Sequence, residues 1–120
     1  MSEEVSWQVE LMVKPGELDN FRALTKEMIE TTKGESGVLI YERFVSADGR
    51  VVHVYERYMN SVAAVAHLVA FGQRYGERFK SMVDRRRFTV FGAPSNELKS
   101  ILDRFNADYL GLLDGFSIVH

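Results

Sequence analysis

The chain has 120 residues, 46% of them hydrophobic and 27% charged, which is the balance of one ordinary globular domain. Its net charge of −2 gives no basic nucleic-acid footprint, and the lack of cysteine excludes disulfides, thiolate nucleophiles, zinc–thiolate sites and iron–sulfur ligation. No apolar run approaches a membrane span and no signal-peptide core is present, so we expect a soluble cytoplasmic protein with neither nucleic acid nor membrane as partner.

The first two predicted elements are a strand and a helix. Apolar and mostly polar residues alternate from Val5 to Val13, which predicts a strand with one strongly apolar face that ends at Pro15-Gly16. From Glu17 to Lys33 the apolar residues recur at helical spacing, which predicts a helix. The segment from Gly34 to Gly37 is then the turn into the next strand.

A hairpin follows this turn. Strand-like runs from Val38 to Val45 and from Arg50 to Tyr58 are separated by a Ser-Ala-Asp-Gly turn, in which Asp48-Gly49 tolerates positive φ. Both strands carry apolar residues on both faces, so both faces should be covered. Helices of this small domain supply one cover, and a second subunit is the expected source of the other.

The next segment predicts a second helix, capped by Asn60 or Ser61. Its predicted core stripe consists of Val65, Leu68, Tyr75, Phe79 and Met82. A neighbouring stripe consists of His67, Phe71, Arg74 and Arg78. Gly72 and Gly76 each weaken a helix by about 1 kcal/mol relative to Ala, which favours a break or kink between them.

The C-terminal third predicts a strand, a helix and an apolar tail. The basic run from Asp84 to Arg87 is interpreted as the solvated end of the second helix, with an anion-binding site as the alternative. A fourth strand is expected from Arg87 to Phe91, and a third helix from Asn96 to Asn106. The tail from Tyr109 to Val119 must dock somewhere, as an added edge strand or on a partner subunit.

The predicted order is β-α-β-β-α-β, followed by an extra C-terminal helix and a short extension. This order is that of the ferredoxin-like class of α+β folds. We therefore expect a single domain over residues 1–120, with a core from about 5 to 92 and a C-terminal helix and tail over 95–120.

Three short pieces of this sequence resemble a known family. They are the Gly-x-Leu-x-Tyr-Glu run that begins at Gly37, the Tyr-Glu-Arg-Tyr run that ends at Tyr58, and Ala66-His67-Leu68. These pieces and the order of elements resemble the antibiotic biosynthesis monooxygenase (ABM) domains. The resemblance implies a homodimeric α/β barrel in which two sheets face each other and each subunit keeps its own pocket.

The resemblance also implies a range of activities. Some members oxidise phenolic or quinol-type aromatics with O₂ and need no metal or flavin, others degrade heme, and many have no established activity. Two departures matter here. Tyr58 stands where members commonly have Trp. The heme-degrading branch has a Trp at the position of His67, a histidine at that of Glu77 and an Asn on the first strand, which is not evident from Val5 to Val13, so heme degradation is disfavoured. We therefore expect no cofactor.

His67 is the candidate catalytic residue, because an imidazole can take a proton from a phenol or hydroquinone and the resulting anion can reduce O₂. Its alternative role is packing or hydrogen bonding at the pocket or dimer edge. The candidate substrate-binding residues are Tyr41, Tyr58, Phe71 and Tyr75, whose alternative role is core and interface packing.

Charged residues on the hairpin have a structural interpretation. Glu42 and Glu56, with Arg43 and Arg57 beside them, predict cross-strand ion pairs. Metal binding by His53 and His67 would need a further ligand, so no metal site is predicted. The leading function is an ABM-like, cofactor-independent monooxygenase for a small aromatic, phenolic or quinol compound. The alternative is a non-catalytic dimeric barrel that binds a small apolar ligand or serves a structural or stress role.

Overall fold

The computed structural model describes residues 3–118, which form one layer of strands and one layer of helices. In chain order the elements are β1 (Val5–Val13), α1 (Leu18–Thr32), β2 (Val38–Val45), β3 (Val51–Tyr58), α2 (Ser61–Met82), β4 (Val83–Gly92), α3 (Asn96–Leu102), a 3₁₀ turn (Asp103–Phe105) and β5 (Asp108–Leu110). The predicted α+β, ferredoxin-like order with an added helix and extension is therefore confirmed.

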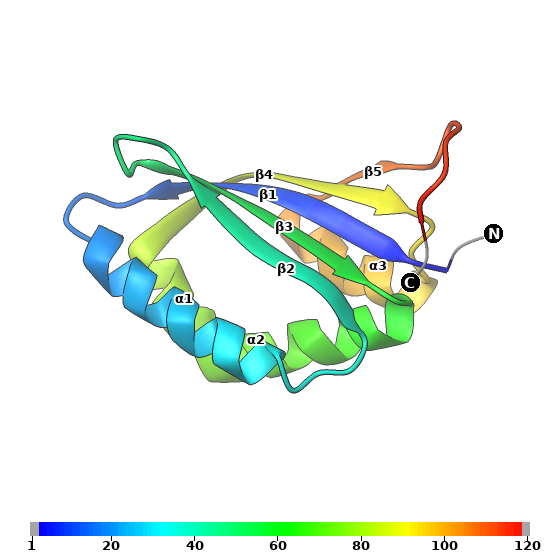
Figure 1. Cartoon of the computed structure of the whole chain (residues 1–120), viewed down its shortest axis with the longest axis horizontal. Helices are drawn as coiled ribbons and strands as arrows, with labels where there is room; N and C mark the ends of the chain where they lie inside the picture. The colour runs from blue at the N-terminus through cyan, green and yellow to red at the C-terminus, as the bar shows by residue number, and fades with distance from the viewer. Residues whose placement is uncertain (1–2, 119–120) are drawn as a thin grey trace.

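The sheet has the strand order β2-β3-β1-β4-β5, in which β4 and β5 are parallel and the other neighbours are antiparallel. Figure 1 shows α1, α2 and α3 on the same side of this sheet. The opposite face carries no helix within the described part of the chain. None of the helices over residues 3–118 is both long and apolar enough to cross a membrane.

The core lies between the sheet and the helices, and β1 crosses its middle. On β1 the buried positions Val5, Trp7, Val9 and Leu11 alternate as predicted, and all four face the helices. The Trp7 ring packs 4.7 Å from the ring of Tyr58 on β3, centroid to centroid. It also lies 5.7 Å from the ring of Phe88 on β4, so strands on both sides of β1 contribute to one aromatic core.

Two glycines position the hairpin. Gly49 has a φ of +72° in the predicted Asp-Gly turn, a conformation that glycine adopts without strain. Gly37 precedes β2, and a Cβ atom there would lie 2.4 Å from the Cβ of Ala63 on α2. Only glycine lets the start of β2 approach α2 this closely.

α2 is continuous over 22 residues, so the helix does not break near Gly72 or Gly76. Asn60 caps it, because its side chain accepts a hydrogen bond of 2.9 Å from the backbone N–H of Ala63. The helix buries one face along its length, and this burial outweighs the small intrinsic penalty of each glycine.

The buried face of α2 differs in part from the predicted stripe. It consists of Ala64, His67, Tyr75, Phe79 and Met82. Val65 and Leu68, which were expected in the core, are only partly buried. Tyr75, Phe79 and Met82 are buried as predicted. In the first half of the helix the buried positions lie one residue earlier than predicted, at Ala64 and His67, which places His67 on the buried face.

β4 begins directly after α2, at Val83, so the run from Asp84 to Arg87 lies in a strand and not at a solvated helix end. The prediction failed because consecutive charged residues hide the alternation of a strand. β4 pairs with β1 as far as Val13, the last residue of β1. The register shifts between Glu10 and Leu11, where β4 has one residue more than β1. Arg85 packs its guanidinium over the Phe105 ring, 4.4 Å from the centroid.

The C-terminal segment docks only in part. α3 is shorter than predicted and passes at Leu102 into the 3₁₀ turn. The expected edge strand forms over Asp108–Leu110. Residues 111–118 are exposed, and the side chain of Leu113 is completely so. Val119, the end of the predicted apolar tail, lies outside the described residues.

Candidate functional site

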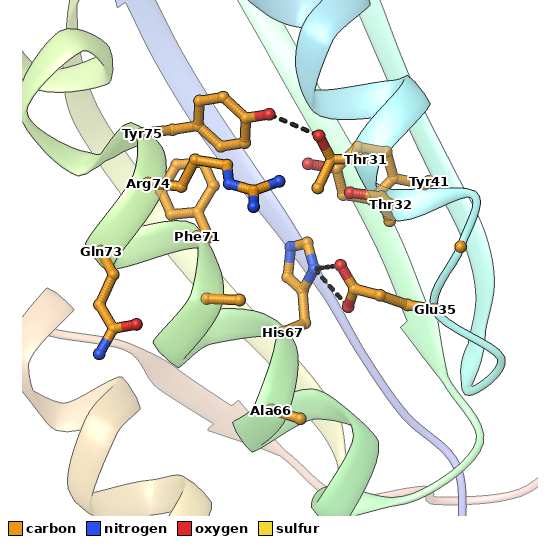
Figure 2. A pocket seen from close by; sticks show the side chains of 12 residues that line it. Thr31, Thr32, Glu35, Tyr41, Ala66, His67, Phe71, Gln73, Arg74 and Tyr75 are labelled. Carbon is orange, nitrogen blue, oxygen red and sulfur yellow. Dashed lines mark hydrogen bonds and ion pairs between the residues drawn. The ribbon is translucent and has the colours of Figure 1, made fainter.

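His67 lies on α2 and faces the interior, with 4% of its surface exposed. Figure 2 shows its ring beside the carboxylate of Glu35, which comes from the turn between α1 and β2. The Nδ1 atom of His67 lies 3.1 Å and 3.3 Å from the two carboxylate oxygens. Packing of α1 against α2 brings together these two residues, which are 32 positions apart.

The Glu35 carboxylate fixes the tautomer of neutral His67. An ionised carboxylate only accepts hydrogen bonds, so Nδ1 must carry the proton and donate it. The lone pair of neutral His67 is therefore on Nε2. That atom lies 3.9 Å from Oε1 of Glu56, too far for a hydrogen bond. Nε2 is thus the atom able to take up a proton.

Glu56 is the centre of a buried polar cluster under the histidine. Its Oε1 accepts hydrogen bonds from the indole N–H of Trp7 at 3.0 Å and from the hydroxyl of Tyr58 at 2.5 Å. Its Oε2 accepts one from Nη2 of Arg43 at 2.6 Å. Three donors from three strands therefore hold this carboxylate in one position.

A cavity of about 590 Å³ opens beside His67, between the end of α1, the start of β2 and the middle of α2. This volume lies within the range that holds a small organic ligand. The residues that line it are Thr31, Thr32, Gly34, Glu35, Tyr41, Ala66, His67, Ala70, Phe71, Gln73, Arg74 and Tyr75. Figure 2 shows side chains of α2, among them His67 and Phe71, facing residues of the end of α1, the turn after it and β2.

The cavity brings together most of the residues singled out in the sequence. His67, Tyr41, Phe71 and Tyr75 line it, whereas Tyr58 does not. Tyr58 is fully buried, and its hydroxyl donates a hydrogen bond to Oε1 of Glu56. Burial, with the Glu56 carboxylate as a further cause, holds the pKa of Tyr58 well above its usual value, so this phenol stays neutral.

Tyr41 presents the opposite wall of the cavity to His67, with the two rings edge-on at a centroid distance of 5.3 Å. Burial raises the pKa of Tyr41 to about 12. Its hydroxyl lies near Thr32, but no donor or acceptor within residues 3–118 has hydrogen-bonding geometry to it. The guanidinium of Arg43 covers its ring at 3.5 Å from the centroid. Tyr41 is therefore a neutral phenol whose hydroxyl is buried and has no hydrogen-bond partner of good geometry within residues 3–118.

The remaining wall combines an apolar surface with a hydroxyl pair. The Phe71 ring stacks near His67 at a centroid distance of 6.2 Å and lies equally far from Tyr75. The Tyr75 hydroxyl and the Thr31 hydroxyl are 2.5 Å apart, which joins α2 to α1 across the cavity. The cavity thus has aromatic walls and a few fixed polar groups.

The predicted ion pairs form in part. Arg43 pairs with Glu56 at 2.6 Å, and both side chains are less than a tenth exposed. Glu42, by contrast, is exposed, and Arg57 pairs with Glu4 at 3.3 Å. Strand alternation explains this, because adjacent residues on a strand point to opposite faces.

Sequence reasoning missed Glu35, Thr31 and Arg74 as cavity residues. Glu35 was interpreted only as part of a turn, and nothing local distinguishes it from any other glutamate. His53 lies on the helix-free face, where it bonds Gln8, so it is not near His67. Within residues 3–118 no three His, Cys, Asp or Glu side chains are grouped to hold a metal ion.

A family model for antibiotic biosynthesis monooxygenase matches residues 5–85, which is more than half of the chain. The chain belongs to this family. The match includes Glu35, Tyr41, Glu56 and His67, and it ends before the C-terminal helix and tail. No curated protein sequence shows a significant match.

Solved structures share the fold of this ABM protein. MupZ from Pseudomonas fluorescens is 23% identical with a TM-score of 0.88, over 98% of this chain and 91% of MupZ. Rv0793 from Mycobacterium tuberculosis is 28% identical with a TM-score of 0.57, over 78% and 96%. SnoaB from Streptomyces nogalater, a cofactor-independent oxygenase crystallised as the N63A mutant, is 12% identical with a TM-score of 0.67, over 79% and 97%. The likeness to MupZ extends past the family core and takes in the C-terminal extension.

Proposed function

We propose that this protein is a cofactor-independent monooxygenase that oxidises a small phenolic or quinol-type aromatic compound. The observation that carries the proposal is the Glu35–His67 pair on the wall of an aromatic cavity. The family and the description of SnoaB as a cofactor-independent oxygenase support the reaction type. The substrate class rests on the aromatic walls and on the placement of a base beside them.

In the proposed reaction Nε2 of His67 takes the phenolic proton, and Glu35 stabilises the imidazolium that results. The phenolate transfers one electron to O₂, and the aryloxyl radical and superoxide then combine at a ring carbon that bears hydrogen. His67 returns its proton to the peroxide. Loss of the ring hydrogen together with the terminal OH group as water gives the quinone, so one oxygen atom enters the product and one leaves as water.

The cavity walls contribute orientation. Tyr41 contributes a neutral aromatic wall opposite His67, because burial raises its pKa to about 12. Phe71 offers a flat apolar surface to the ring of the substrate. Together these groups favour a planar aromatic compound whose phenolic oxygen points toward His67.

Oxygen uptake with a panel of hydroquinones and phenols tests the proposal. We expect consumption of O₂, formation of the quinone, and a rate that falls about 100-fold or more in His67→Ala, the scale of general-base catalysis. Added imidazole should restore part of the rate, because the substitution leaves space for it. Unchanged turnover of every accepted substrate in His67→Ala would remove His67 as the base.

A second candidate function is non-catalytic binding of a small apolar ligand. The observation that favours it is the low exposure of His67, whose Nδ1 is already hydrogen-bonded. Under this alternative an aromatic ligand raises the melting temperature, while no phenol or quinol supports oxygen uptake. The two measurements together separate the two functions.

We further propose that two chains pair through their helix-free sheet faces to form an α/β barrel. Strand alternation places Ile40 and Phe44 of β2, and Val51 and Tyr55 of β3, on this face. The Phe44 side chain is 58% exposed in the single chain. Sedimentation at micromolar concentration is expected to give a dimer mass, and a monomer mass would contradict the barrel.

A further inference from the structure

The cavity beside His67 contains one strongly basic side chain. Arg74 lies on α2 two helical turns beyond His67 and is the only Lys or Arg among the lining residues. Figure 2 shows its side chain extending from the helix into the cavity, with the guanidinium directed toward Thr31. A permanent positive charge therefore lies at the exposed edge of a pocket with aromatic walls.

This charge has no acidic partner among the described residues, although neighbouring arginines do. Arg78, one turn further along α2, forms two hydrogen bonds of 3.1 Å and 2.7 Å with the carboxylate of Glu27. The Arg43 guanidinium pairs with Glu56. Glu35, the one acid that lines the cavity, is engaged by His67. The Arg74 guanidinium is thus available to a ligand.

We propose that Arg74 binds a carboxylate on the substrate, so that the preferred ligand is an aromatic hydroxy acid. The inference rests on the proposed function, because it assigns the other end of the same phenolic substrate. A guanidinium presents parallel N–H groups that match the two oxygens of a carboxylate, and such charge-assisted pairs are stronger than neutral hydrogen bonds.

The spacing on α2 sets the shape of this ligand. Seven residues separate His67 and Arg74, which corresponds to about 10.5 Å along a helix axis at 1.5 Å per residue. The phenolic oxygen must reach Nε2 of His67 while the carboxylate reaches Arg74. The two groups therefore belong at opposite ends of a rigid ring system that lies along Phe71, which is between them on the helix.

Binding of 6-hydroxy-2-naphthoate and of its amide, 6-hydroxy-2-naphthamide, tests the charge requirement. The two probes share their rings and their phenol and differ in the carboxylate. Titration calorimetry without oxygen should show the acid binding about five- to tenfold more tightly, as expected for a charge-assisted contact near a cavity mouth. The preference should shrink as salt is raised. Acid binding no tighter than amide binding, including weak or absent binding of both, would overturn the inference.

Variants of the two arginines test the residue. Arg74→Gln is expected to abolish the preference for the acid, and Arg74→Lys to keep part of it. Arg78→Gln is the matched control on the same helix, and it should keep the full preference. Both arginines are exposed, so the variants should melt near the parent temperature. An acid preference that survives in Arg74→Gln would overturn the assignment to Arg74.

These measurements are independent of turnover. A protein that prefers the acid through Arg74 but consumes no oxygen would refute the proposed monooxygenase and leave the anion site standing. A protein that oxidises neutral phenols and acids equally well, with no change in Arg74→Gln, would refute the anion site alone. The isomer 3-hydroxy-2-naphthoate, whose two groups are adjacent, should lose the advantage of the extended acid. Equal binding of the two isomers would contradict the proposed spacing.

Discussion

Nδ1 of His67 lies 3.1 Å and 3.3 Å from the two carboxylate oxygens of Glu35, within hydrogen-bonding distance of both. One residue comes from a turn and the other from the buried face of α2. The contact orients the imidazole and leaves Nε2 as its basic atom. The same relationship that makes His67 a candidate base thus also explains why so little of it is exposed.

Replacing Glu35 with glutamine tests the role of this contact. The amide carries no charge to stabilise the imidazolium, and its NH₂ group can donate to Nδ1 and so favour the tautomer with the proton on Nε2. We expect kcat for an accepted phenol to fall about tenfold or more, within the range of general-base effects. Steady-state oxygen uptake measures this.

Glu30→Gln is the matched control for that variant. Glu30 is on the exposed side of α1, where it pairs with Lys33, and it does not line the cavity. Its substitution should leave kcat unchanged, and Glu35→Asp should retain part of the activity. A Glu35→Gln protein with parental kcat would show that the contact only packs the histidine.

Replacing Glu56 with glutamine should act mainly on stability. The carboxylate pairs with Arg43, and both side chains are less than a tenth exposed, so the change leaves a buried guanidinium without its counter-charge. We expect the free energy of unfolding to fall by about 3 kcal/mol, the scale for breaking a buried ion pair. Urea denaturation measures the change.

The exposed pair of Glu27 and Arg78 provides the comparison for Glu56. Glu27→Gln removes an ion pair of similar length, 2.7 Å, from the surface, where solvent screens it. Its unfolding midpoint should stay close to that of the parent. Equal effects of Glu27→Gln and Glu56→Gln would mean that burial of the Glu56 cluster adds nothing to stability.

Tyr41 gives a prediction for alkaline pH. Its pKa is about 12 in the fold and near 10 when unfolded, so the folded state holds the proton more firmly. The stability that this difference supplies is fully present below about pH 10 and is lost as the pH rises through about 12. Stability should therefore decline less steeply over this window in Tyr41→Phe than in the parent, as measured by urea denaturation at several pH values. Identical slopes would contradict the raised pKa.

The exposed tail gives a prediction about assembly. Residues 111–118 place Leu112, Leu113 and Phe116 in solvent at exposures of 80–100%, which is unusual for large apolar side chains. If the tail contacts a partner subunit, truncation after Leu110 should raise the dissociation constant of the dimer about tenfold, which is a loss of about 1.4 kcal/mol in the free energy of association. Sedimentation equilibrium measures this. A truncated chain with parental self-association would remove the tail from the interface.

The sequence by itself determined the order of elements. Alternation on β1, helical spacing on α1 and the Asp48-Gly49 turn are local signals, because burial of one face imposes a period on each element. The short pieces around Gly37 and His67, with their apolar, aromatic and acidic positions, also indicated the family that the match over residues 5–85 shows. Each of these features depends on a few residues that are close together in the sequence.

Only the tertiary structure decided which side chains form the site. Glu35 hydrogen-bonds His67, the Tyr58 hydroxyl donates to Glu56, and Arg74 lines the cavity. All three depend on how α1, α2 and the sheet pack. The burial of Ala64 and His67 in place of Val65 and Leu68 in the first half of α2, and the course of β4 through a run of charges, arise in the same way. Packing of elements distant in the chain sets each of these, and no local period encodes it.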